Sequence, residues 1–141
     1  MEWSKPKKPT NDDMLVMYFV VREELGMGAG KVGAQCAHAC QLILMEQDNI
    51  RKQIRPLSDS QYNILRRMNY WNSRDLNGGF RKVVLKASDK EWASLKDIYD
   101  PIIVCDAGLT EVEPGSETVM ALWPIYKNER DKVLKRLRCL T

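Results

Sequence analysis

The feature that most constrains the fold is an unbroken apolar run close to the N-terminus. It spans residues 14–21, is rich in Val and aromatic side chains, and ends at Arg22-Glu23-Glu24, after which glycines follow. A run of this kind, without a polar residue at every second position, predicts a strand that is buried on both faces. Such a strand lies at the centre of a sheet that other layers cover on either side. The sequence therefore predicts the α/β class.

Apolar periodicity and capping signals predict the other elements. Val32, Cys36, Ala39 and Ile43 recur at intervals of four, three and four, which predicts one apolar helix face. A Ser-x-x-Glu capping box at residues 88–91 opens another helix. The predicted elements are strand 14–21, helix 30–47, helix 59–71, strand 80–87, helix 88–98, strands 102–105 and 118–123, and helix 127–140. This order indicates an α/β sandwich around a small mixed sheet.

The composition fits one cytoplasmic domain. The chain has 141 residues, of which 44% are hydrophobic, enough for one packed core without a disulfide scaffold. Residues 1–12 are rich in Lys and Pro and predict a flexible basic tail, followed by a single domain over residues 13–141. The longest apolar run is too short to span a membrane, and the N-terminus lacks the apolar segment of a secretory signal. A net charge of +3 is compatible with nucleic acid without being diagnostic of it.

The cysteines give no sign of a metal site or a disulfide. None of the four belongs to a Cys-x-x-Cys pair, and the chain has one histidine. Cys36 and Cys40 fall in a helical apolar pattern, and Cys105 ends an apolar strand. We interpret the cysteines as reduced core residues of a cytosolic protein and expect neither a metal ion nor a cofactor.

A glycine-rich segment follows the first predicted strand and opens the first helix. Residues 28–33 match the pattern G-x-G-x-x-G, which suggests dinucleotide binding. The chain is too short for the strands of a dinucleotide fold, and polar sequence replaces the expected acidic strand end. A phosphate loop of the Walker type is excluded because Leu25 replaces its first glycine and Val32 its magnesium-binding hydroxyl.

Helix geometry gives this segment a second interpretation. Lys31, Gln35 and His38, at positions i, i+4 and i+7, share a face that differs from the core stripe. The helix dipole disfavours a lysine in the first turn, unless it faces an anion or a developing oxyanion beside the free amides. The alternative is a solvated lysine and glutamine, with His38 bonded to backbone.

Four polar residues lie in the connection between the predicted strands 102–105 and 118–123. They are Asp106, Thr110, Ser116 and Thr118. A carboxylate and hydroxyls mounted between two strands can form a polar site on a rigid sheet. The alternative is turn chemistry, because Asp, Ser and Thr cap loops and Pro114-Gly115 makes a turn. We expect the other acidic residues here to be solvated: Glu111, Glu113 and Glu117.

The two polar segments together resemble the archaeal and eukaryotic-type peptidyl-tRNA hydrolase family. The matching residues are Val20-Val21-Arg22, then Gly26-Met27-Gly28-x-Gly30-Lys31-x-x-Ala34-Gln35-Cys36-Ala37-His38-Ala39, then Asp106-Ala107-Gly108-x-Thr110, and finally Pro114-Gly115-Ser116-x-Thr118-Val119. The segment 82–87 is similar to the family's second strand, so the resemblance covers most of residues 14–124. The pair of motifs is specific to the family, whereas either motif alone is less so.

The resemblance implies a fold, a reaction and a set of site residues. The implied fold is a three-layer sandwich, with a four-stranded mixed sheet and helices on both faces. The implied reaction is hydrolysis of the ester between peptide and tRNA in peptidyl-tRNA, without metal or cofactor. The implied catalytic residues are Lys31, Asp106, Thr110 and Thr118. The implied substrate-binding residues are Gly28, Gly30, Gln35, His38 and Ser116. Peptidyl-tRNA is the expected partner, no membrane is expected, and a homodimer is allowed.

The sequence also departs from the family pattern. Ala29 replaces a usual lysine, and Gly33 a usual alanine. The segment 88–105 is short, whereas the segment 48–79 is long and basic. We expect Arg66 and Arg67 of this long segment to bind tRNA phosphates in place of the lysine missing at position 29. These differences indicate a divergent member.

The residue types favour direct attack by water. Ester hydrolysis needs an activated water and stabilisation of an oxyanion, and no Ser-His-Asp order is visible. Asp106 would orient or deprotonate the water, Lys31 would face the oxyanion, and a resting Lys31–Asp106 ion pair is compatible with these roles. One alternative is a non-catalytic RNA- or protein-binding module that keeps the fold. A nucleotide-binding protein is a more distant alternative.

Overall fold

The computed structural model describes residues 13–74, 78–108 and 111–141. The predicted basic tail, residues 1–12, and the predicted site residue Thr110 lie outside the described residues. No helix in the described part of the chain is long and apolar enough to cross a membrane.

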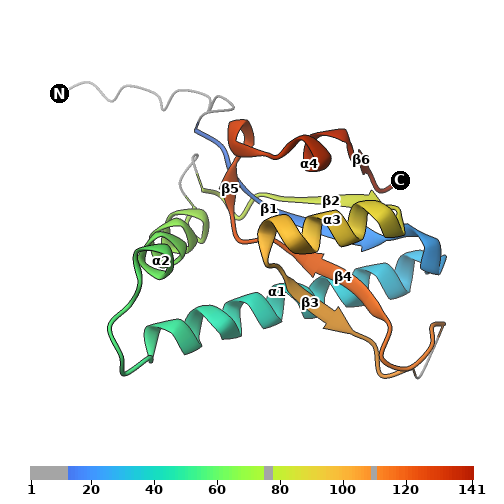
Figure 1. The fold of residues 1–141 in the computed structure, drawn as a ribbon, viewed down its shortest axis with the longest axis horizontal. Helices are drawn as coiled ribbons and strands as arrows, with labels where there is room; N and C mark the ends of the chain where they lie inside the picture. Colours follow the sequence, from blue (N-terminus) through green and yellow to red (C-terminus); the bar gives the residue numbers. More distant parts are fainter. Residues whose placement is uncertain (1–12, 75–77, 109–110) are drawn as a thin grey trace.

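The predicted central strand is β1 (Leu15–Arg22), and it lies in the middle of the sheet (Figure 1). It pairs in parallel with β2 (Lys82–Ala87) and antiparallel with β4 (Glu117–Ala121), and β4 pairs antiparallel with β3 (Ile102–Cys105). Every β1 residue from Leu15 to Val21 is at most 3% exposed. Burial of both faces explains why the strand is apolar throughout rather than alternating.

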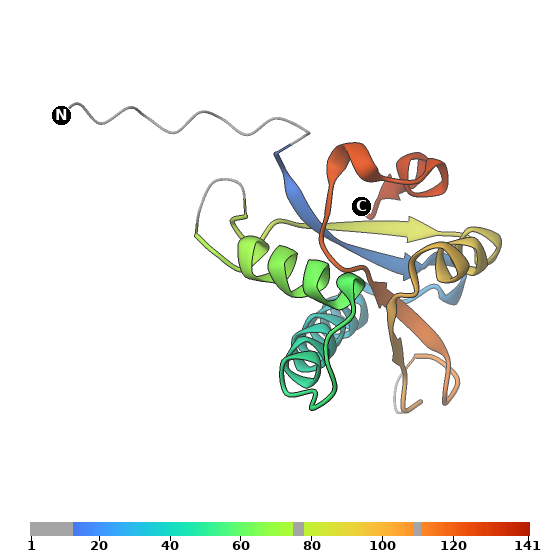
Figure 2. The same cartoon turned by 60° about the vertical axis from the view of Figure 1, so that its left-hand side comes forward.

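Helices cover both faces of the sheet, which makes three layers (Figures 1 and 2). The side chains of Leu15, Met17, Phe19 and Val21 pack under α1 (Ala29–Arg51) and α2 (Asp59–Trp71). The alternate side chains of β1 pack under α3 (Asp89–Tyr99) and α4 (Lys132–Arg136). The α/β class and the helices on both faces are therefore confirmed.

The prediction of a four-stranded sheet is wrong, because the described residues form a sheet of six strands. The order is β3-β4-β1-β2-β6, and β5 pairs with β1 outside this path. The two unpredicted strands are short, β5 (Ile125–Tyr126) and β6 (Arg138–Cys139). A strand of two residues is too short to show a periodic pattern in the sequence. These strands form because they pair with β1 and β2, not because of a local pattern.

The predicted helix over residues 127–140 is present only in part. A 3₁₀ turn, η2 (Lys127–Glu129), ends at an extended Arg130, and Asp131 then caps the short α4. Leu137 is extended again, and β6 pairs antiparallel with β2. The apolar spacing from Val133 to Leu140 looked helical, but Leu140 packs on the opposite side of the sheet from Leu137. Pairing with the edge of β2 outweighs continuation of the helix because it satisfies open backbone groups of that edge.

The remaining sequence predictions agree with the structure to different degrees. Helix α1 continues beyond the predicted residue 47, because Gln47 and Ile50 stay on its buried face. The capping box of α3 is present, with both Ser88 and Glu91 bonded as expected. The prediction that all cysteines are core residues is wrong for Cys105 and Cys139, which are exposed and carry free thiols.

Candidate active site

A cleft of about 580 Å³ lies between the start of α1 and the end of β3. Its lining residues are Gly30, Lys31, Ala34, Gln35, His38, Cys105, Asp106, Ala107 and Glu111. The helix face predicted from positions i, i+4 and i+7 thus meets the predicted acidic residue at the end of a strand, although the two segments are about 70 residues apart in sequence. The sheet brings them together because α1 packs across β3 and β4.

Lys31 and Asp106 form an ion pair at the wall of the cleft. The Lys31 Nζ donates to Asp106 Oδ1, and the two side chains are only 13% and 6% exposed. The hydrogen bond from Lys31 holds the pKa of Asp106 below its ordinary value, against the opposing effect of burial. The backbone amide of Gly108, which donates to Asp106 Oδ2 at 2.6 Å, lowers the pKa of Asp106 further. Asp106 is therefore an ionised carboxylate with both oxygens oriented.

Gln35 and Thr118 form a buried support behind Asp106. Gln35 Nε2 donates to Thr118 Oγ1 at 2.8 Å and, more weakly, to Asp106 Oδ1 at 3.4 Å. The Thr118 hydroxyl in turn donates to the carbonyl of Val104 at 3.3 Å. Gln35 is 3% exposed and Thr118 is fully buried. Thr118 therefore reaches Asp106 through Gln35 and does not line the cleft.

The loop after β3 holds the Asp106 backbone rigidly. The Asp106 amide donates to the carbonyl of Ser116 at 2.9 Å, and the amide of Gly115 donates to the carbonyl of Asp106 at 2.7 Å. Gly108 has a φ of +77°, and a Cβ at this residue would lie 2.4 Å from Pro114 Cγ. Only glycine can therefore present its amide to Asp106 here.

Glu111 is a site residue that the sequence interpretation missed. It is exposed, as expected, and its carboxylate also accepts a hydrogen bond from the Gly28 amide at 2.8 Å and lines the cleft. Gly28 is the N-cap residue of α1 and has no side chain to cap the helix, so Glu111 supplies a negative acceptor from another segment. A helix start without a polar N-cap near an acidic loop was the available signal.

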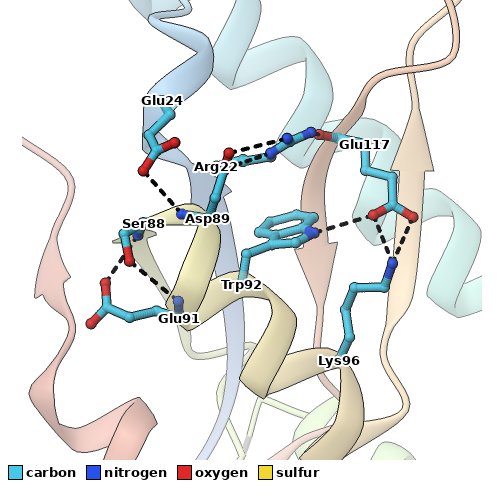
Figure 3. Close-up of polar contacts among 8 residues, drawn as sticks. All are labelled: Arg22, Glu24, Ser88, Asp89, Glu91, Trp92, Lys96 and Glu117. Carbon is cyan, nitrogen blue, oxygen red and sulfur yellow. Dashed lines mark hydrogen bonds and ion pairs between the residues drawn. The ribbon is translucent and has the colours of Figure 1, made fainter.

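The expectation of a solvated Glu117 is wrong, as Figure 3 shows. Its carboxylate accepts from Lys96 at 2.8 and 3.0 Å, and this contact holds the pKa of Glu117 below its ordinary value. Its backbone carbonyl accepts from Arg22, which also pairs with Asp89 at 2.7 Å. The cluster fixes the first residue of β4, and the next residue, Thr118, points to the opposite side of the strand. This network thus holds the buried support of the cleft in register.

The other predicted substrate-binding residues lie outside the cleft. Ser116 lines a neighbouring hollow together with Glu24 and Gly108. Arg66 and Arg67 belong to α2, at the opposite end of α1 (Figure 1). The Arg51 guanidinium on the last turn of α1 donates to Asn69 of α2 at 2.6 Å. At 1.5 Å per residue, the start of α1 is about 30 Å from this contact.

Comparison with known proteins gives a consistent result. Residues 15–140 match the family model described as peptidyl-tRNA hydrolase PTH2. A protein named peptidyl-tRNA hydrolase from Thermoplasma acidophilum is 31% identical over 130 residues, which cover 88% of this chain and 97% of the relative. One of the same name from Methanocaldococcus jannaschii is 35% identical, over 88% of this chain and 98% of the relative. A human protein named peptidyl-tRNA hydrolase 2, mitochondrial, is 34% identical over 86% of this chain and 62% of its own length.

Proposed function

The chain belongs to the peptidyl-tRNA hydrolase PTH2 family and hydrolyses peptidyl-tRNA, and we propose that the Lys31–Asp106 pair is its catalytic centre. The observation that supports this proposal most directly is the ion pair itself. It is nearly buried, faces the cleft, and has its carboxylate oriented by Gln35 and Gly108. A structural ion pair would not need a cleft on one side and a polar support on the other.

Asp106 orients the water that attacks the ester carbonyl. While Lys31 is bonded to it, Asp106 has a lowered pKa, and a carboxylate of low pKa is a weak base. When Lys31 turns towards the oxyanion, Asp106 loses the contact that lowers its pKa most, and its basicity rises. The carboxylate can then take a proton from the attacking water and return it to the departing ribose oxygen. This coupling makes the base strong only while the tetrahedral intermediate forms.

The oxyanion is stabilised by Lys31 and by the start of α1. The first intrahelical bond of α1 runs from the Val32 amide to the carbonyl of Gly28, so the amides of residues 29–31 have no acceptor within the helix. Gly30 and Lys31 line the cleft. A helix N-terminus and an ammonium group both favour developing negative charge.

The roles of the other predicted residues follow from where they lie. Gln35 and Thr118 are positioning residues for Asp106, because neither is exposed enough to bind substrate. His38 is exposed and lines the cleft, and we propose that it contacts the terminal nucleoside of the substrate.

Among residues 13–74, 78–108 and 111–141, no three His, Cys, Asp or Glu side chains are grouped to hold a metal ion. Hydrolysis should therefore persist in EDTA, and loss of activity restored by one metal ion would contradict this mechanism.

The decisive experiment compares single substitutions in the ion pair with a lysine control at the C-cap of the same helix. Lys31→Ala and Asp106→Asn should each lower kcat on peptidyl-tRNA by orders of magnitude, and the double variant should be little worse because the two residues act together. Lys52→Ala removes a lysine whose side chain is 75% exposed, in an i,i+4 pair with Asp48, and should leave kcat unchanged. Near-normal turnover by folded Lys31→Ala protein would refute the assignment. Binding of peptidyl-tRNA without cleavage by the wild type would favour a non-catalytic module. The cytoplasmic location and the homodimer stay predictions.

A further inference from the structure

The outer face of α2 carries an alternation of aromatic and basic side chains. Tyr62, Arg66 and Tyr70 are spaced by four residues and so share one side of the helix, opposite to the buried Met68 and Trp71. Tyr62 is 62% exposed and Tyr70 is 43% exposed, and Arg66 is also exposed. At 1.5 Å per residue, the two rings are about 12 Å apart along the helix axis, with Arg66 midway. We call these three residues the α2 stripe.

A hollow beside the stripe is held in shape by packing against β5. It has a volume of about 320 Å³ and is lined by Arg66, Arg67, Tyr70 and Tyr126. The Arg67 guanidinium lies 5.0 Å from the centre of the Tyr126 ring and makes two bonds of 2.8 Å to the Glu129 carboxylate. Arg67 thus has a structural role in this wall, whereas Arg66 is exposed and donates to Asn63 of its own helix at 2.9 Å.

The charge of this part of the chain favours a polyanion. Residues 48–82 contain eight Lys and Arg against three Asp and Glu, a net charge of +5, whereas the rest of the chain sums to −2. Exposed aromatic rings next to arginine are the surface on which unpaired nucleic-acid bases stack, while the arginine binds phosphate. A protein partner would also use Tyr and Arg, but it would not need this excess of positive charge.

From these observations we propose that the α2 stripe binds unpaired nucleotides of the tRNA at a distance from its 3′ end. The proposal rests on the proposed function, because it takes the RNA part of the substrate as the ligand. The cleft holds the ester, and the stripe lies on α2, which contacts the last turn of α1 at about 30 Å from Lys31. A single nucleoside cannot reach both places, whereas a folded tRNA can. The stripe therefore contributes to the affinity for the whole RNA and not to the chemistry.

The test uses two substrates that carry the same peptide, full-length tRNA and a single nucleoside. The double variant Tyr62→Ala/Tyr70→Ala should raise KM for peptidyl-tRNA about 5- to 150-fold for each stacked base that is lost, with kcat unchanged. Tyr62→Phe/Tyr70→Phe keeps the rings and should behave as wild type. Arg66→Gln should reduce the slope of log KM against log salt by about 0.7 to 0.9, the loss of one phosphate contact. Hydrolysis of the peptidyl nucleoside should be unchanged in every variant.

Several outcomes would overturn the proposal. One is an unchanged KM for peptidyl-tRNA in folded alanine variants, with folding checked by thermal melting. Another is an equal loss on the peptidyl nucleoside, which would trace the effect to the cleft. A change of oligomeric state by size-exclusion chromatography without a change in KM would assign the stripe to a protein interface. If the wild type cleaves neither substrate, the proposed function fails, and direct binding of uncharged tRNA to the same variants still decides on the stripe.

Discussion

Replacing Thr118 by Val tests whether the buried support controls the chemistry. The two side chains have nearly the same shape, but Val cannot accept the hydrogen bond from Gln35 or donate one to Val104. The Gln35 amide then keeps only the 3.4 Å contact with Asp106. A buried polar group that loses its partner costs about 1–3 kcal/mol in the free energy of unfolding. For a chain of this size, that corresponds to a fall in Tm of roughly 4–10 °C.

The effect on catalysis should be larger than the effect on binding. Thr118 is fully buried and does not line the cleft, so KM should stay close to the wild-type value. Asp106, however, loses the fixed orientation of one of its contacts, and a small misplacement of a catalytic group can cost about 100-fold. We expect kcat on peptidyl-tRNA to fall about 10- to 100-fold at saturating substrate.

The control for this substitution is Thr118→Ser. Serine keeps the hydroxyl and both hydrogen bonds and loses only a buried methyl group, which costs about 1 kcal/mol of stability. It should melt slightly earlier and turn over at nearly the wild-type rate. The reasoning is refuted if Thr118→Val has wild-type kcat, or if Thr118→Ser is as slow as Thr118→Val.

Two further predictions concern the contacts of Asp106. Lys31→Ala removes the largest contribution that lowers the pKa of Asp106 and leaves the opposing effect of burial, so the pKa of Asp106 should rise, which NMR titration of its carboxyl carbon measures. In the wild type, the stability that the Asp106 carboxylate contributes is fully present above the unfolded pKa of about 3.9. It is lost as the pH falls through the lower pKa of the folded protein. A pKa of Asp106 at or above about 3.9 in the folded wild type would contradict the observed contacts. Gly108→Ala should lower both Tm and kcat, because it adds a clash with Pro114 to the strain of a positive φ. Gly115 has a φ of +81° and nothing within 4 Å of an added Cβ, so Gly115→Ala introduces backbone strain without a clash. It should therefore lower Tm and kcat less than Gly108→Ala does, which melting and turnover assays measure.

The elements with a strong local signal could be predicted from the sequence. β1 has an uninterrupted apolar run, and α3 has a complete capping box, so both were found. The segment after residue 126 could not be resolved in this way, because the apolar spacing around Leu134 and Leu137 suits a helix while the backbone turns to pair with β2. Strand pairing between distant segments is not encoded in local periodicity.

In the candidate site, too, residues with a local sequence pattern were predicted and a residue that depends on a long-range contact was missed. Helical spacing alone placed Lys31, Gln35 and His38 on one face, and the family resemblance linked that face to Asp106. Glu111 was missed, because its role depends on a contact with Gly28 across 83 positions of sequence. Without known distances, the acidic residues of this loop are explained equally well by turn formation and by a role in the site.

Helix α1 has 23 residues and meets the cleft at its first turn and α2 at its last. The length of α1 therefore fixes the distance between the ester in the cleft and any RNA bound to α2. One inserted residue in this helix would shift the far end by 1.5 Å and also rotate it by about 100°, taking the α2 stripe out of line. Only a change of whole turns, about 5.4 Å each, keeps both ends facing the same way. The loop between α1 and α2 can vary in length without this penalty, so relatives that accept substrates of the same size should differ there before they differ in the length of the helix.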